Sequence, residues 1–104
     1  MPRGKPLPEP LPEAEVEIDL HGCPPDQALR RLSNGLHGAR IRGADRVLVI
    51  TGRGWGNLAR QPVLRGKVEA WLRGPEGQRH GVLGYEIASK GGALLVKLRS
   101  ARQP

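Results

Sequence analysis

Four consecutive apolar residues, Val47-Leu48-Val49-Ile50, constrain the fold of this chain more than any other segment. A strand with one face in water alternates apolar and polar side chains, whereas this run contains no polar residue. The run therefore predicts a central strand that is covered on both faces. It stops abruptly at Thr51-Gly52-Arg53-Gly54, where the glycines predict a loop.

A segment of alternating character precedes this strand. Val16, Ile18 and Leu20 share one face and polar residues separate them, which predicts a half-buried strand that ends at Gly22. Residues 24–43 start with two prolines and continue with apolar residues at helical spacing, which predicts a helix. Because a crossover of more than 20 residues contains this helix, the two strands are expected to be parallel neighbours.

The second half of the chain predicts one helix and two further strands. The helix is expected from about Pro62 to the Gly74-Pro75 pair, and the strands at 82–88 and 93–99, joined as an antiparallel hairpin. The order β-α-β-α-β-β predicts an α/β two-layer sandwich, with two helices packed on a four-stranded mixed sheet. We expect a proline-rich flexible leader at 1–14, the domain at 15–100 and a tail at 101–104.

Composition narrows the classes of function. The chain has 17 Lys and Arg against 10 Asp and Glu, and the net charge of +7 favours a polyanionic partner. Three aromatic residues are too few for a base-stacking platform, and a single cysteine excludes an intrachain disulfide. Without an apolar run long enough to cross a membrane, we predict a cytoplasmic protein, without membrane contact, that is a monomer.

Two polar motifs are expected to meet at the sheet edge where both parallel strands end. Asp19 and His21 lie two residues apart on the side of the first strand that faces away from the core. An imidazole beside a carboxylate can transfer a proton near neutral pH, and a glycine loop with Arg53 offers N–H groups and a guanidinium to a phosphate. Each motif alone is equally compatible with an ordinary turn and a solvated histidine.

The motifs Ile18-Asp19-Leu20-His21-Gly22, Thr51-Gly52-Arg53-Gly54 and Lys90-Gly91-Gly92-Ala93 resemble the Smr (small MutS-related) domain over residues 15–100. The resemblance implies a small stand-alone member of a nuclease-type family that binds nucleic acid. It also implies a fold similar to the C-terminal domain of translation initiation factor three. Members of the family nick or cleave DNA, or cleave RNA, including on ribosomes.

In the family, the Asp and His of the first motif are the functional pair, which implies this role for Asp19 and His21. The second motif is a His or Thr followed by Gly-x-Gly, and here Thr51, Gly52 and Gly54 carry it. Thr51 in place of His removes a second proton carrier, so any acid–base chemistry is expected to depend on His21.

The leading hypothesis is an endonuclease that cleaves phosphodiester bonds of DNA or RNA, with Asp19 and His21 as catalytic residues. The expected nucleic-acid-binding residues are Thr51, Gly52, Arg53, Gly54 and Lys90. No metal ligand is assigned, and a divalent ion such as Mg²⁺ stays open as a cofactor. The alternative is a non-catalytic basic module that binds nucleic acid or the ribosome. Phosphate contacts do not read the sugar, so the sequence does not choose between DNA and RNA.

Overall fold

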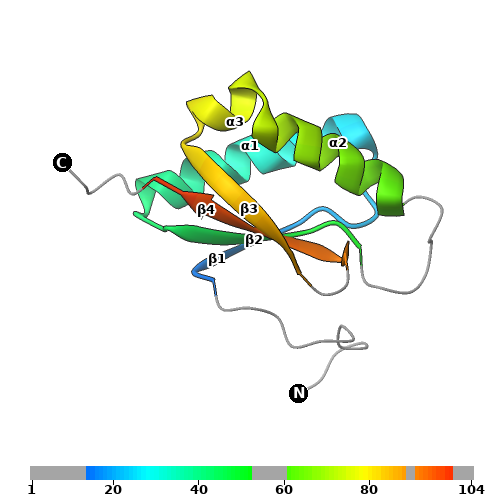
Figure 1. Ribbon diagram of the computed structural model, residues 1–104, viewed down its shortest axis with the longest axis horizontal. Helices are drawn as coiled ribbons and strands as arrows, with labels where there is room; N and C mark the ends of the chain where they lie inside the picture. Colours follow the sequence, from blue (N-terminus) through cyan, green and yellow to red (C-terminus); the bar gives the residue numbers. More distant parts are fainter. Residues whose placement is uncertain (1–13, 53–60, 89–90, 100–104) are drawn as a thin grey trace, which may run out of the picture.

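The computed structural model describes residues 14–52, 61–88 and 91–99. These residues form four strands and three helices, shown in Figure 1. In chain order they are β1 (Val16–Asp19), α1 (Pro25–Ile41), β2 (Arg46–Ile50), α2 (Gln61–Arg73), α3 (Pro75–Arg79), β3 (Val82–Ala88) and β4 (Ala93–Leu98).

The strands form one mixed sheet in the order β1-β2-β4-β3. β1 and β2 are parallel, whereas β4 is antiparallel to both β2 and β3. All three helices lie on the same side of the sheet, which gives the two layers visible in Figure 1. The predicted two-layer α/β fold, the parallel first pair and the antiparallel hairpin are therefore confirmed.

The short helix α3 is an addition to the two predicted helices. The Gly74-Pro75 pair does end α2, which stops at Arg73, but Pro75 is also the first residue of α3. A proline has no N–H to donate and its φ already suits a helix, so the first helical position accepts it readily. The same property places Pro25 at the start of α1, with Pro24 as the extended residue before it.

The main core lies between the helices and the sheet. α1 contributes a stripe at helical spacing, and the strands contribute alternate residues. Its most completely buried members are Leu20, Ala28, Leu32, Leu36, Val47, Val49, Val68, Leu94 and Val96. The residues of β2 and β4 between these form a second buried cluster of Leu48, Ile50, Ala93 and Leu95. The four apolar residues of β2 are each no more than 2% exposed, which confirms the prediction of a covered central strand.

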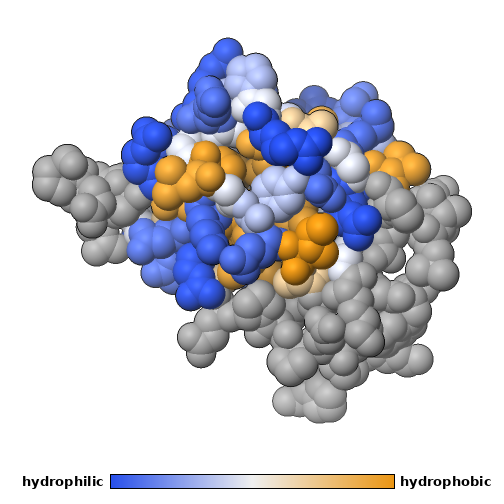
Figure 2. Space-filling model, viewed as in Figure 1, coloured by the Kyte–Doolittle hydropathy of each residue, from blue (hydrophilic) through white to orange (hydrophobic). Residues whose placement is uncertain are grey.

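The surface is mainly hydrophilic, and Figure 2 shows only separate apolar groups on the face turned to the viewer. The large apolar side chains that stay exposed among the described residues are Ile41, Val63, Leu83 and Ile87. Within the described ranges, none of the helices has the length and apolar character needed to cross a membrane.

Candidate active site

The parallel pairing of β1 and β2 brings the ends of both strands together, as the sequence predicted. Asp19 is level with Ile50 in the register, and the Leu20 N–H donates to the Ile50 carbonyl at 2.7 Å. The residues that follow each strand therefore start side by side at one edge of the sheet. In Figure 1 the start of α1 and the start of β4 lie at this same end of the molecule.

A tight turn at the end of β1 holds His21 in place. The Cys23 N–H donates to the Leu20 carbonyl at 3.0 Å, which closes a four-residue turn over His21 and Gly22. Gly22 has a φ of 79°, in the left-handed region that residues with a side chain rarely adopt. Leu20 is fully buried in the core on one side of the turn, so His21 is left at the surface.

Asp19 and His21 form a hydrogen-bonded pair. The Nδ1 of His21 lies 2.5 Å from Oδ1 of Asp19, and the backbone N–H of His21 donates to the same oxygen at 3.1 Å. Because an ionised carboxylate only accepts hydrogen bonds, this contact assigns the proton to Nδ1. The imidazole then presents the lone pair of Nε2, which makes no hydrogen bond with any described residue. Both side chains are open to solvent, with 47% of His21 and 37% of Asp19 exposed.

Arg31 of α1 contacts the same strand end, which sequence reasoning did not anticipate. Its Nη1 donates to the backbone carbonyl of Asp19 at 3.4 Å. Arg31 is exposed, so its guanidinium adds positive charge beside the Asp19–His21 pair. The only sequence signal was an arginine on the outer face of the helix, and solvated arginines occur there in most helices.

The start of the glycine loop is more enclosed than the sequence suggested. Thr51 is only 2% exposed, and its hydroxyl oxygen is buried without a hydrogen-bond partner. The backbone N–H groups of Thr51 and Gly52 both donate to the Gly92 carbonyl, at 3.0 and 3.1 Å. The Gly52 N–H, which was expected to bind phosphate, is thus already occupied, and so is the N–H of Thr51. They tie the loop to the start of β4.

Three of the predicted binding residues, Arg53, Gly54 and Lys90, lie outside the described residues. The described residues Gly91 and Gly92 next to them accept hydrogen bonds from other elements. Gly92 accepts the two bonds from the glycine loop, and the Gly91 carbonyl accepts one from Nη1 of Arg65 at 3.4 Å. The ends of β2 and of the hairpin are therefore joined at the edge where Asp19 and His21 lie.

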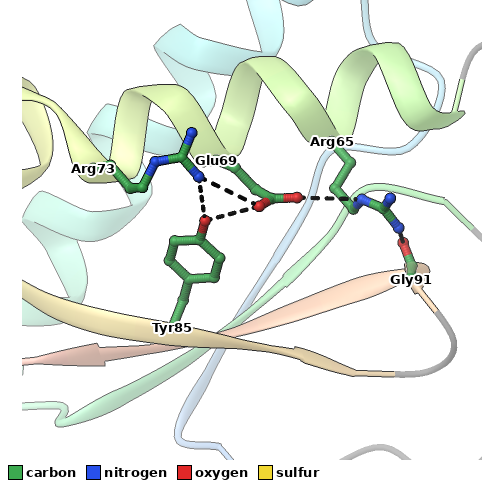
Figure 3. A network of polar contacts seen from close by, with 5 residues as sticks. All are labelled: Arg65, Glu69, Arg73, Tyr85 and Gly91. Carbon is green, nitrogen blue, oxygen red and sulfur yellow. Dashed lines mark hydrogen bonds and ion pairs between the residues drawn. The ribbon is translucent and has the colours of Figure 1, made fainter.

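Arg65 also belongs to a polar cluster between α2 and β3, shown in Figure 3. Glu69 lies at its centre, with its two oxygens 3.3 Å from Nε of Arg65 and 3.6 Å from Nη1 of Arg73. Tyr85 donates its hydroxyl proton to Glu69 at 2.8 Å and accepts from Arg73 at 2.8 Å. Burial raises the pKa of Tyr85 above its ordinary value, and the hydrogen bond to Glu69 raises it further.

The side chains at the end of β1, namely Asp19, His21 and Arg31, are those of an acid–base site rather than of a metal site. Among the described residues, no three His, Cys, Asp or Glu side chains are grouped so that they could hold a metal ion. The arrangement instead offers one exposed imidazole nitrogen, a carboxylate that fixes the ring, and a guanidinium nearby.

The two-layer fold, with the Asp19–His21 pair at one edge of its sheet, is a nuclease-like fold of a class of domains that bind nucleic acid. The chain belongs to the Smr domain family, whose family model matches residues 18–99. It is similar to the crystal structure of the Smr domain of Thermus thermophilus MutS2, at 27% sequence identity and a TM-score of 0.62. That match covers 81% of this chain and 98% of the other. A search of curated proteins gave no match.

Proposed function

We propose that the protein is an endonuclease that cleaves phosphodiester bonds, with Asp19 and His21 as its catalytic pair. The observation that carries this proposal is the 2.5 Å contact between Asp19 Oδ1 and His21 Nδ1, on an imidazole that is 47% exposed. A carboxylate on one ring nitrogen fixes the tautomer and leaves the other nitrogen free to accept a proton. The exposed position at a sheet edge lets a polymer reach that nitrogen.

In this mechanism His21 acts first as a base and then as an acid. Its Nε2 removes the proton from the attacking oxygen, which belongs to water or, in RNA, to the 2′-hydroxyl. That oxygen bonds to phosphorus, the bond to the leaving oxygen breaks, and the imidazolium returns its proton to the leaving oxygen. Asp19 orients the ring and stabilises the imidazolium. Proton transfer by a positioned side chain contributes about 10²- to 10⁴-fold to a rate.

Phosphate binding is assigned to the glycine loop and the hairpin turn. Arg53 and Lys90 are proposed to contact phosphate oxygens through their charged ends, together with the Gly54 N–H. Thr51 and Gly52 are proposed to act at the base of this loop, where their bonds to Gly92 fix its direction. Residues 16–104 carry 15 basic and 7 acidic side chains, a net charge of +8, which supports an attraction to the polyanion.

The test is a cleavage assay on supercoiled plasmid and on structured RNA, each with and without Mg²⁺. We expect the unmodified protein to cleave at least one polymer, and His21→Ala and Asp19→Asn to lose that activity. Glu17→Gln is the matched control, because Glu17 is an exposed carboxylate on the same strand, two residues before Asp19. Cleavage that survives both site variants, or that Glu17→Gln abolishes equally, contradicts the assigned pair.

The positive charge also supports a second candidate, a module that binds nucleic acid or the ribosome without cleaving. In that case the unmodified protein binds both polymers in a strongly salt-dependent manner and cleaves neither. Arg53→Ala weakens the binding, whereas His21→Ala leaves it unchanged. Cleavage by the unmodified protein, together with the effects of Arg53→Ala and His21→Ala on binding, therefore distinguishes the two candidates.

A further inference from the structure

A basic groove lies at the end of α1 opposite to the Asp19–His21 pair. It has a volume of about 690 Å³ and is lined by His37, Arg40, Ile41, Arg79 and His80. None of the described residues that line it is acidic. We refer to these five residues as the far groove. The last turns of α1 form one wall, and the end of α3 forms the other.

Arg40 is held in position within the far groove by a glycine. Gly81 has a φ of 79°, and a Cβ atom there would lie 3.1 to 3.3 Å from Cζ, Nε and Nη1 of Arg40. The guanidinium therefore packs against the bare backbone of Gly81. Its Nε is buried without a hydrogen-bond partner, and Arg40 forms no ion pair with any described residue. A fixed guanidinium that no carboxylate neutralises is well suited to bind an anion.

Of the other charged or titratable groups of the far groove, Arg79 is available to a ligand and His80 has a structural role. Arg79 pairs only with Glu76 of its own short helix, at 3.1 Å, and both side chains are largely exposed, so the pair is weak. His80 has a structural role, because its Nδ1 lies 2.8 Å from the Glu76 carbonyl and its Nε2 lies 3.2 Å from the Ser33 hydroxyl. Arg40 and Arg79 thus carry the two guanidinium groups of the far groove that can bind an anionic ligand.

We propose that the far groove binds a backbone phosphate of the same nucleic acid that reaches the Asp19–His21 pair. This inference rests on the proposed function in one respect, namely that the substrate is a nucleic acid. α1 has 17 residues and is about 25 Å long at 1.5 Å per residue. Phosphates repeat every 3.4 Å along one strand of a duplex, so about seven nucleotides connect the two ends of α1.

The surface between the two ends suits a polyanion better than an isolated phosphate. From position 27 to position 44 the chain contains no Asp or Glu. The exposed residues of α1 in this stretch include Arg31 beside Asp19, then Asn34 and His37, and the exposed Arg42 directly follows the helix. Between Arg31 and the far groove, a strand that follows α1 therefore meets only neutral or basic side chains of this helix, whereas Asp26 of its first turn and Glu76 of α3 line the neighbouring hollow. The inference predicts that only a nucleic acid long enough to reach both ends of α1 binds with full affinity, whereas a single site at the sheet edge requires no such minimum length.

The experiment compares binding of two labelled oligonucleotides, one of about four and one of about sixteen nucleotides, at several salt concentrations. The tested variants are Arg79→Ala and the double variant Arg40→Ala/Arg79→Ala. Lys67→Ala is the matched control, because it removes one exposed charge from α2 without touching the far groove. Thermal melting checks that each variant is folded, and Arg79→Ala keeps the test valid if loss of Arg40 disturbs the packing on Gly81.

We expect the double variant to bind the longer oligonucleotide at least about tenfold more weakly, with a salt slope reduced by about 1 to 2. Binding of the short oligonucleotide should not change, and Arg79→Ala should show part of the effect. Equal losses of affinity for both oligonucleotide lengths, or an unchanged salt slope, contradict the proposal that the far groove binds a phosphate. Arg40 and Arg79 then serve only the carbonyl ends of α1 and α3, where positive charge is favourable in any case. If the unmodified protein binds neither oligonucleotide, the proposed function fails as well.

Discussion

Two polar clusters in this molecule use similar groups for different ends. The Asp19–His21 pair lies at the surface, with both side chains open to solvent. The cluster around Glu69 joins two arginines and a tyrosine between α2 and β3, with the central carboxylate only 20% exposed (Figure 3). In the first cluster the Nε2 of His21 makes no hydrogen bond with any described residue, whereas in the second both carboxylate oxygens of Glu69 are engaged inside the protein.

This difference in exposure leads to different expectations for the two clusters, one concerning activity and the other concerning stability. An exposed ion pair contributes little to folding because water solvates both partners well. A polar group that is mostly withdrawn from water must keep its partners, or its desolvation is not compensated. We therefore expect variants of the Asp19–His21 pair to change activity without changing stability, and variants of the Glu69 cluster to do the reverse.

The largest effect is expected from His21→Ala. Loss of the proton carrier should lower the cleavage rate by about 10²- to 10⁴-fold, while urea denaturation shows an unchanged free energy of unfolding. The double variant Asp19→Asn/His21→Ala should be no slower than His21→Ala, because Asp19 acts through the ring. Additive losses in the double variant would mean that Asp19 acts independently, and a clear loss of stability would make the pair structural.

The next effect is expected from Glu69→Gln. The amide keeps the shape of the side chain but cannot neutralise Arg65 and Arg73, and it replaces charge-assisted bonds by weaker ones. We expect the free energy of unfolding to fall by about 1 to 3 kcal/mol in urea, with an unchanged denaturant slope. Cleavage per folded molecule should stay normal below the unfolding transition. Glu17→Gln, an exposed carboxylate outside the cluster, is the control that should show no such loss.

A smaller effect with a distinct pH dependence is expected from Tyr85→Phe. The variant loses one donated and one accepted hydrogen bond, which should cost about 0.5 to 1.5 kcal/mol at neutral pH. Burial, with a further contribution from Glu69, raises the pKa of Tyr85 above 10.0, so the folded state favours the neutral phenol. That contribution is fully present below pH 10 and is lost as the pH rises through the raised pKa.

Melting curves between pH 8 and pH 11 test this dependence. The unmodified protein should lose stability faster than Tyr85→Phe towards the alkaline end, so the gap between them should narrow. A gap that stays constant or widens above pH 10 would show that the phenol is not held neutral by the fold.

Periodicity and glycine placement predicted the sheet from the sequence because both are local signals. The uninterrupted run at 47–50 identified the central strand. The expectation that Asp19 and His21 share one face of a strand that ends at Gly22 was wrong, because β1 ends at Asp19 and His21 lies in the turn that follows, where its ring contacts the carboxylate. Helix α3 was missed because Pro75 was interpreted only as the end of α2, although the first turn of a helix also accepts proline.

The enclosure of Thr51 and the occupied N–H of Gly52 could not be predicted in the same way. Both depend on the Gly92 carbonyl, some forty residues further along the chain, and therefore on the register of β4 against β2. The far groove depends on a contact of similar separation, between Arg40 and Gly81. Local patterns do not encode such pairings, which exist only once the sheet and helices have packed.

The smallest effect is expected from Glu86→Gln, which tests whether exposure alone separates the two kinds of cluster. Glu86 accepts a hydrogen bond from Lys97 at 2.9 Å on the solvent side of β3 and β4, and that bond lowers its pKa below the ordinary 4.5. A lowered pKa gives a contribution that is present above pH 4.5 and lost as the pH falls through the lower value. Because both side chains are well exposed, we expect no measurable shift in melting temperature at pH 7. A loss of stability as large as that of Glu69→Gln would show that geometry matters more than burial in these pairs. The expectation that variants of the Asp19–His21 pair leave stability unchanged would then be wrong.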